Sequence, residues 1–105
     1  MAKYDAKRIA YVQQEQLLNR FCGAISKLKS ATAVKRFLKD LLNRNERIML
    51  VRRLLIAEML IAAKTYQEIQ KQLRCGRSTI ARVQRWLNFG RNGYKDAIRT
   101  NQTKK

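Results

Sequence analysis

The sequence predicts an all-α protein that forms one small domain over residues 1–105, and three observations lead to this prediction. Proline is absent and glycine occurs 4 times, so few residues would break a helix. Hydrophobic residues make up 46% of the chain, which is too many for a disordered basic segment. A chain of 105 residues buries only a modest core, so a core shared with a second copy would add stability.

The first two helices are expected in the part of the chain before residue 43. Apolar residues recur at helical spacing over 4–28, with polar residues between them. A second helix follows to about Leu42, and either Ser30 or Thr32 is available as its N-cap.

A third helix is expected from Asn43 to about Ala63, because Asn43 and Glu46 have the spacing of a capping box. This helix is apolar on nearly every side, so it must be surrounded by other segments. In so small a protein a partner chain is the easier source of cover. We therefore expect residues 1–63 to form the core helices of an intertwined homodimer. A monomer that wraps the third helix in the first two is the alternative.

Residues 65–87 predict a helix-turn-helix. Thr65 and Glu68 form a second capping box, and a short helix, a turn at 74–76 and a helix to about Leu87 follow. The inward positions of both helices and the turn hold apolar or small residues: Ile69, Leu73, Cys75, Ile80 and Val83. The same spacing also fits an amphipathic helical hairpin that only completes the core.

The last part, residues 88–105, is expected to form a turn, a short helix over 94–98 and a polar, basic tail. Trp86 precedes it and neighbours Leu87 and Phe89, which favours packing in a dimer core over stacking on a base.

The charge of the chain indicates a polyanionic partner. Lys and Arg number 24 against 7 Asp and Glu, a formal net charge of +17. DNA, RNA and anionic membrane surfaces are the candidates. The most apolar run, 48–63, is interrupted by Arg52, Arg53 and Glu58, and the apolar faces suit a core, so we expect no membrane partner.

Composition argues against an enzyme and against a metal site. Histidine, the commonest metal ligand and general base, is absent, and Cys22 and Cys75 lie far apart. No spaced carboxylate pair and no glycine-rich phosphate loop occur. The N-terminus has no apolar segment of signal-peptide length, so we expect a cytoplasmic, nucleoid-associated protein.

The second helix of the predicted motif carries the candidate DNA contacts. Small residues let a helix lie close to the major-groove edges, and arginine pairs with guanine in two-pronged fashion. The candidate base contacts are Arg77, Ser78 and Ala81. The candidate phosphate contacts, which position a protein without reading sequence, are Lys71, Arg74, Arg82 and Arg85.

Several motifs resemble the Trp repressor superfamily, and in particular its small Trp-repressor-related subfamily often called YerC/YecD-like. They are "RFLKDLLNRNE", "RRLLIAEML", "TYQEI", "STIARV" and "LNFGRNGY", which lie between about Phe37 and Tyr94. The resemblance implies an interlocked, all-helical homodimer that binds DNA through paired helix-turn-helix units.

The resemblance also raises the question of a tryptophan corepressor. Arg52, Thr79 and Arg82 fall at positions that hold arginine, threonine and arginine in the family's amino-acid pocket. The small glycine that follows is replaced by Val83, whose branched side chain should crowd the indole. We therefore expect no tryptophan binding and no cofactor.

The turn departs from the family pattern as well. Arg74 stands where members usually have glycine, and a left-handed arginine costs roughly 1–2 kcal/mol. Gly76, two residues later, is the alternative site for that backbone conformation.

The leading interpretation is a transcriptional regulator that reads a near-palindromic site in double-stranded DNA as a homodimer. The alternative is a non-specific nucleoid- or RNA-binding basic protein, in which phosphate neutralisation alone supplies the affinity.

Overall fold

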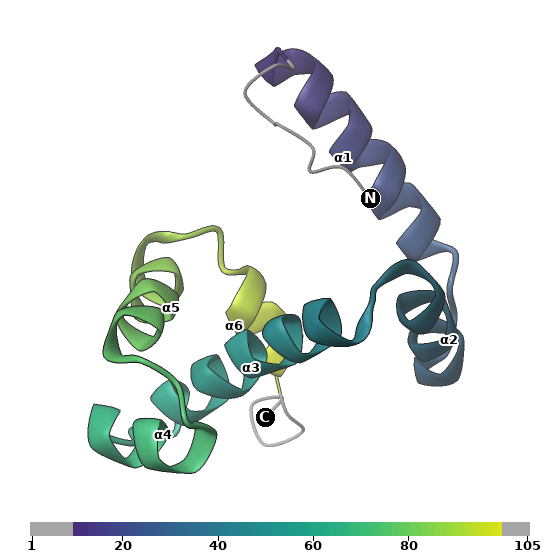
Figure 1. Ribbon diagram of the computed structural model, residues 1–105. Helices are drawn as coiled ribbons and strands as arrows, with labels where there is room; N and C mark the ends of the chain where they lie inside the picture. The colour runs from purple at the N-terminus through teal and green to yellow at the C-terminus, as the bar shows by residue number, and fades with distance from the viewer. Residues whose placement is uncertain (1–9, 100–105) are drawn as a thin grey trace. The chain divides into compact units, whose positions relative to one another are not determined.

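The computed structural model describes residues 10–99, which form six helices and no strand (Figure 1). The helices are α1 (Tyr11–Ser26), α2 (Ala31–Leu41), α3 (Arg44–Ile61), α4 (Tyr66–Leu73), α5 (Arg77–Phe89) and α6 (Gly93–Ile98). The all-α prediction is confirmed. The expected extension of the first helix to Tyr4 and the basic tail lie outside the described residues. Within residues 10–99 no helix has the length and apolar character needed to cross a membrane.

The chain divides into two compact units, one before and one after the junction of Asn43 and Arg44. The first unit contains α1 and α2. Ser30 is the N-cap of α2, because its hydroxyl accepts a hydrogen bond from the Ala33 N–H at 3.1 Å. The rings of Phe21 and Phe37 join the two helices, with centroids 6.2 Å apart. Neither helix has a fully buried residue.

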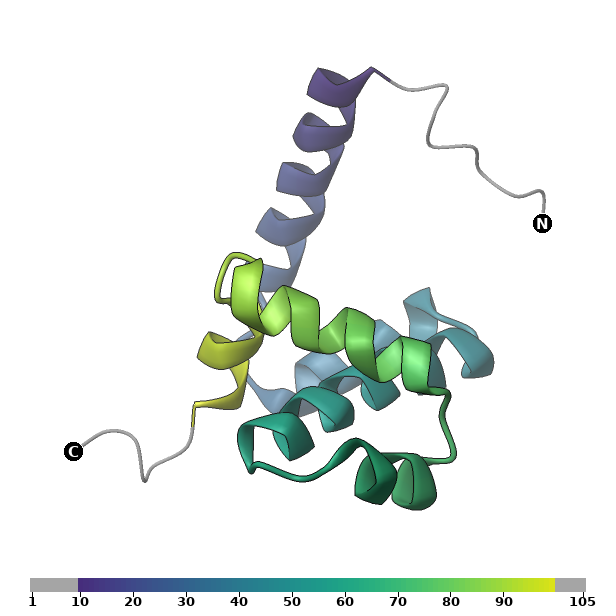
Figure 2. The same cartoon turned by 90° about the vertical axis from the view of Figure 1, so that its left-hand side faces the viewer.

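The second unit contains α3, α4, α5 and α6 and has a core of its own. Helix α3 contacts the other three helices, and α4 also contacts α5. Figure 2 shows α5 running across the front of this unit with α4 beside it. The buried core residues come from α3, α4 and α5: Ile56, Ala57, Ile69, Ile80, Val83 and Leu87.

The contacts of the third helix join it to α4–α6 in the second unit. The reason is that Ile56 and Ala57 pack into the core formed by α4 and α5. Met59 and Leu60 are half-buried against this core, whereas the other large apolar residues of α3 stay exposed: Ile48, Met49, Leu50, Val51, Leu54, Leu55 and Ile61. That residues 1–63 supply the helices of a dimer stays a prediction.

The end of α3 is set by a left-handed residue at Ala63, which has a φ of 65°. The Lys64 N–H donates to the Met59 carbonyl and the Ala63 N–H to the Leu60 carbonyl, both at 3.0 Å. This pair of bonds is the Schellman arrangement, in which glycine usually takes the left-handed position. Thr65 then begins the next helix after a connection of only a few residues.

One glycine in the "LNFGRNGY" segment is required by a close approach. A Cβ atom added to Gly90 would collide with the backbone carbonyl of Trp86, one turn earlier in α5. A Cβ added to Gly93 would meet nothing within 4 Å. Gly90 therefore lets the chain leave α5 tightly.

Candidate nucleic-acid interface

The start of α4 is fixed by the capping box that the sequence predicted. The Glu68 N–H donates to Thr65 Oγ1 at 3.1 Å, and the Thr65 N–H donates to Glu68 Oε1 at 2.8 Å. The bond from the Thr65 backbone N–H favours the charged carboxylate and, with a smaller effect of the Thr65 hydroxyl, lowers the pKa of Glu68 below its ordinary value of 4.5. The helical pair thus begins at a defined residue.

The turn between α4 and α5 places the left-handed backbone on Arg74. Its φ and ψ are 52° and 48°, and its N–H donates to the Gln70 carbonyl at 2.8 Å, which closes the end of α4. Gly76 has a φ of −79° and an extended conformation that any residue adopts. Of the two alternatives, the arginine carries the strained conformation, at roughly 1–2 kcal/mol.

Three exposed side chains lie at the beginning of α5. They are Arg77, Ser78 and Ala81, the candidate base contacts. Gly76 is the N-cap and supplies no side-chain hydrogen bond to the first turn. Because helix N-termini carry partial positive charge and free N–H groups, this end of α5 suits an anion such as a phosphate.

The candidate phosphate contacts are all exposed but lie in two places. Lys71 lies on α4 and Arg85 on α5, whereas Arg74 and Arg82 line a cavity.

The residues predicted to form the core of the motif differ in burial. Ile69, Ile80 and Val83 are buried, while Leu73 and Cys75 are half-buried and pack against them.

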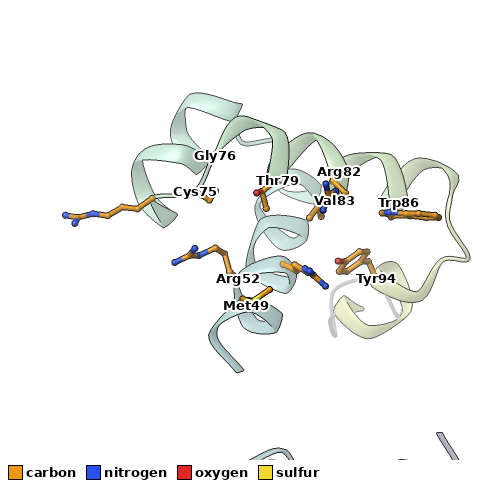
Figure 3. A pocket seen from close by; sticks show the side chains of 11 residues that line it. Met49, Arg52, Cys75, Gly76, Thr79, Arg82, Val83, Trp86 and Tyr94 are labelled. Atoms are coloured by element: carbon orange, nitrogen blue, oxygen red, sulfur yellow. The ribbon is translucent and has the colours of Figure 1, made fainter. Parts of the chain in front are cut away.

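The cavity lies within the second unit and has a volume of about 460 Å³. Figure 3 shows Met49 and Arg52 of α3 facing Thr79, Arg82 and Val83 of α5, with Trp86 and Tyr94 together at one end. The turn supplies Arg74, Cys75 and Gly76, and α3 also supplies Arg53.

Four arginines give this cavity a lining that suits an anion. Arg52, Arg53, Arg74 and Arg82 line it, and no Asp or Glu is found among the described residues that line it. A guanidinium offers several N–H donors in a planar fork that matches a carboxylate or a phosphate. Around the described residues no group of three or more Cys, Asp or Glu could hold a metal ion.

The residues compared with the family's amino-acid pocket do meet here. Arg52, Thr79, Arg82 and Val83 all line the one cavity. Val83 is buried, belongs to the core and also lines this cavity. Trp86 is 50% exposed within its own chain and lines the cavity, so its indole is covered only in part.

Three residues of this surface, namely Arg53, Tyr66 and Gln84, were not singled out from the sequence. The guanidinium carbon of Arg77 lies 4.8 Å from the centroid of the Tyr66 ring, and the Tyr66 hydroxyl donates to Gln84 Oε1. Arg53 was read only as an interruption of an apolar run. Tyr66 and Gln84 are polar residues within two amphipathic helices, which is the one sequence feature that could have drawn attention to them. Their contact could not be predicted, because Tyr66 lies on α4 and Gln84 on α5.

Comparisons with known proteins identify the family of this chain. The family model for the Trp repressor protein matches residues 16–102. The uncharacterized protein YerC of Bacillus subtilis (strain 168) is 36% identical over 81 residues, which cover 77% of this chain and 78% of that protein. The resemblance found in the sequence is confirmed.

Two solved structures are similar in fold. A TrpR like protein from Eubacterium eligens ATCC 27750 has a TM-score of 0.73 and 33% identity, and the match covers 78% of this chain and 84% of that one. A proposed Trp repressor from Staphylococcus aureus has a TM-score of 0.72 and 28% identity, with 89% of this chain and 100% of that one covered.

Proposed function

Because this chain belongs to the Trp repressor family, we propose that it is a DNA-binding transcription regulator in which α4 and α5 act as a helix-turn-helix. The observation that carries the proposal is the exposed start of α5, where Arg77, Ser78 and Ala81 project from a buried scaffold in a chain of charge +17. Helix α5 enters the major groove, and α4 lies across the sugar–phosphate backbone.

The two sets of candidate residues have different tasks. Arg77 pairs with a guanine, which discriminates against other bases by roughly 1–3 kcal/mol, and the small Ser78 and Ala81 allow close approach. Lys71, Arg74, Arg82 and Arg85 neutralise phosphates. Each phosphate contact releases counterions, so affinity falls steeply as salt rises.

The protein acts as a homodimer in this proposal. The exposed apolar side chains of α1 and of the first half of α3 support it, because a second copy is the nearest source of matching apolar cover. A dimer with two-fold symmetry presents two copies of α5. These meet successive major grooves about 34–36 Å apart, so the site is a near-palindrome.

We further propose that the protein has no catalytic role, needs no metal or tryptophan, and works on double-stranded DNA in the cytoplasm at the nucleoid. Val83 takes the place of a small residue beside the arginine-lined cavity, which supports the lack of tryptophan binding. Isothermal titration with L-tryptophan is expected to give no binding heat and no change in DNA affinity. Binding at micromolar tryptophan that tightens the DNA complex would contradict this part.

Selection from a randomised duplex DNA library at near-physiological salt tests the proposal. We expect enrichment of a motif with two symmetric halves about one helical turn apart. Arg77→Ala should relax one base position in each half. Lys35→Ala, which removes the same charge from the exposed face of α2, should leave the motif unchanged.

The second candidate function is non-specific nucleic-acid binding, which the net charge of +17 favours. A library recovered unchanged despite tight binding would establish it and would overturn the sequence-reading role of α5. Equal competition by every duplex at all salt concentrations would be the corresponding result in a titration.

A further inference from the structure

The first residue of α4 and the first residue of α5 are in direct contact. Tyr66 follows the N-cap Thr65, and Arg77 follows the N-cap Gly76. The Arg77 guanidinium lies over the Tyr66 ring, with its central carbon 4.8 Å from the ring centroid. A cation over the face of an aromatic ring is attracted by the ring's quadrupole, so the pair is favourable as well as close.

The tyrosine is held at both ends. Its backbone is fixed by the capping box of Thr65 and Glu68 on either side. Its hydroxyl donates a hydrogen bond to Gln84 Oε1, two turns along α5 from Arg77. Tyr66 is half-buried and packs against the core. The ring therefore provides a fixed surface on which a long, flexible side chain can rest.

The contact restricts the one candidate base-reading side chain with many rotamers. A free arginine loses much conformational freedom when it binds a base edge, and this loss opposes binding. A guanidinium already stacked on a ring loses less. A guanidinium held over a ring through its face keeps the N–H donors at its edge available for hydrogen bonds to a base.

We propose that Tyr66 is a positioning residue for sequence recognition: it stacks under Arg77 and, anchored by Gln84, holds the guanidinium ready for a guanine in the major groove. This inference rests on the proposed function, because it concerns how the same helix pair reads DNA. It adds a residue of α4 to the recognition of bases, which the candidate contacts on α5 alone do not include.

The test compares Tyr66→Leu and Tyr66→Phe in the full chain, with affinities measured on the selected duplex and on duplexes altered at the base that Arg77→Ala relaxes. Leucine keeps an apolar side chain in the half-buried position but removes the ring. Phenylalanine keeps the ring and loses only the bond to Gln84. Circular dichroism of each variant checks that the helices are retained.

We expect Tyr66→Leu to reduce discrimination at that base by about three- to tenfold, and Tyr66→Phe to restore most of it. The salt dependence of binding should stay the same for both variants, because neither removes a phosphate contact. In an Arg77→Ala background, Tyr66→Leu should change discrimination by less than about twofold, since its partner is gone.

Three results would overturn the inference while leaving the proposed function intact. The first is unchanged base discrimination in Tyr66→Leu. The second is an equal loss of discrimination from Tyr66→Leu whether Arg77 is present or replaced. The third is tighter DNA binding by Tyr66→Leu, which would mean that the ring withholds Arg77 from DNA. A wild-type protein that enriches no motif would overturn both the inference and the function on which it rests.

Discussion

The two units of this chain contain similar apolar residues but bury them to different degrees. In α3–α6 six side chains are buried, and they come from three helices that close around one another. In α1 and α2 no residue is buried, and Leu17, Leu18 and Phe21 each remain at least 40% exposed. Two helices share only one seam, whereas four can enclose a core. The difference supports the proposed dimer, in which a second chain would cover α1 and α2.

Helix α3 repeats this contrast within a single element. Its second half contributes Ile56 and Ala57 to the core, while Ile48, Leu50 and Val51 in its first half stay exposed. A helix that is apolar on all sides has to be surrounded. The first half of α3 and the helices α1 and α2 are therefore the parts that a dimer would bury.

Among these predictions, the largest change is expected in the free energy of unfolding when a core residue of the second unit is truncated. Ile80→Ala removes a fully buried side chain that contacts α3 and α4 residues in the core, so the free energy of unfolding should fall by about 2–5 kcal/mol. Phe89→Ala, at a side chain that is 81% exposed, should change it by less than about 0.5 kcal/mol. Urea denaturation followed by circular dichroism at one protein concentration measures both. Equal losses of unfolding free energy in the two variants would mean that Ile80 does not belong to the core of the second unit.

A charge on the exposed face of α3 should act on association. Val51 is 54% exposed in one chain and lies opposite the buried side of the helix. In a dimer, Val51→Glu would bury an unpaired carboxylate, so the dimer dissociation constant should rise at least about 100-fold. Gln67→Glu adds the same charge at an exposed polar position of α4, outside the helices assigned to the dimer, and serves as the control. Sedimentation velocity over a concentration series reports the two constants, and an unchanged constant for Val51→Glu would place the interface elsewhere.

A smaller effect is expected at the turn. Arg74→Gly removes the left-handed strain of an arginine but adds chain entropy to the unfolded state, so it should stabilise the second unit by about 0.5–1 kcal/mol. Gly76→Ala should be tolerated, because Gly76 is extended and an added Cβ would meet only Ser78 Oγ at 3.9 Å. Thermal unfolding compares them. A destabilised Arg74→Gly together with a costly Gly76→Ala would reverse the assignment of the turn.

The smallest effect is a pH dependence at the start of α4. The pKa of Glu68 is lowered in the folded protein, so its contribution to stability is present above the ordinary value of 4.5 and is lost as the pH falls through the lowered pKa. Between about pH 6 and pH 3 the wild type should therefore lose more stability than Glu68→Gln. Thr65→Ser keeps the hydroxyl and both hydrogen bonds, so it should follow the wild type. Melting curves that run parallel for all three proteins would contradict this account.

The features predicted well from sequence are those set by neighbouring residues. Thr65 and Glu68 form the predicted capping box because the two residues of that motif are three apart in the chain. Ser30 was one of two possible caps for α2, and the periodicity of Ile69, Ile80 and Val83 matched the side of each helix that is buried. The helix α5 runs two residues beyond the expected end near Leu87, since Asn88 and Phe89 continue it and Gly90 is its C-cap.

The features that sequence did not give depend on how helices cross. The cavity joins Arg53 of α3 to Arg82 of α5, and the Tyr66–Gln84 bond joins residues 18 apart. The grouping of α3 with α4–α6 follows from the same packing. At the turn the sequence allowed either Arg74 or Gly76 to be left-handed. Only the backbone geometry distinguishes them, because Gly76 serves instead as the extended N-cap of α5.

The comparison of the two units is tested most directly by the mass of the free protein in solution. Sedimentation equilibrium at micromolar concentration should give twice the 12.3 kDa of one chain, with an unfolding midpoint that rises with protein concentration. A single-chain mass at every concentration, together with a concentration-independent midpoint, would contradict the account. The exposed faces of α1, α2 and α3 would then need a partner other than a second copy.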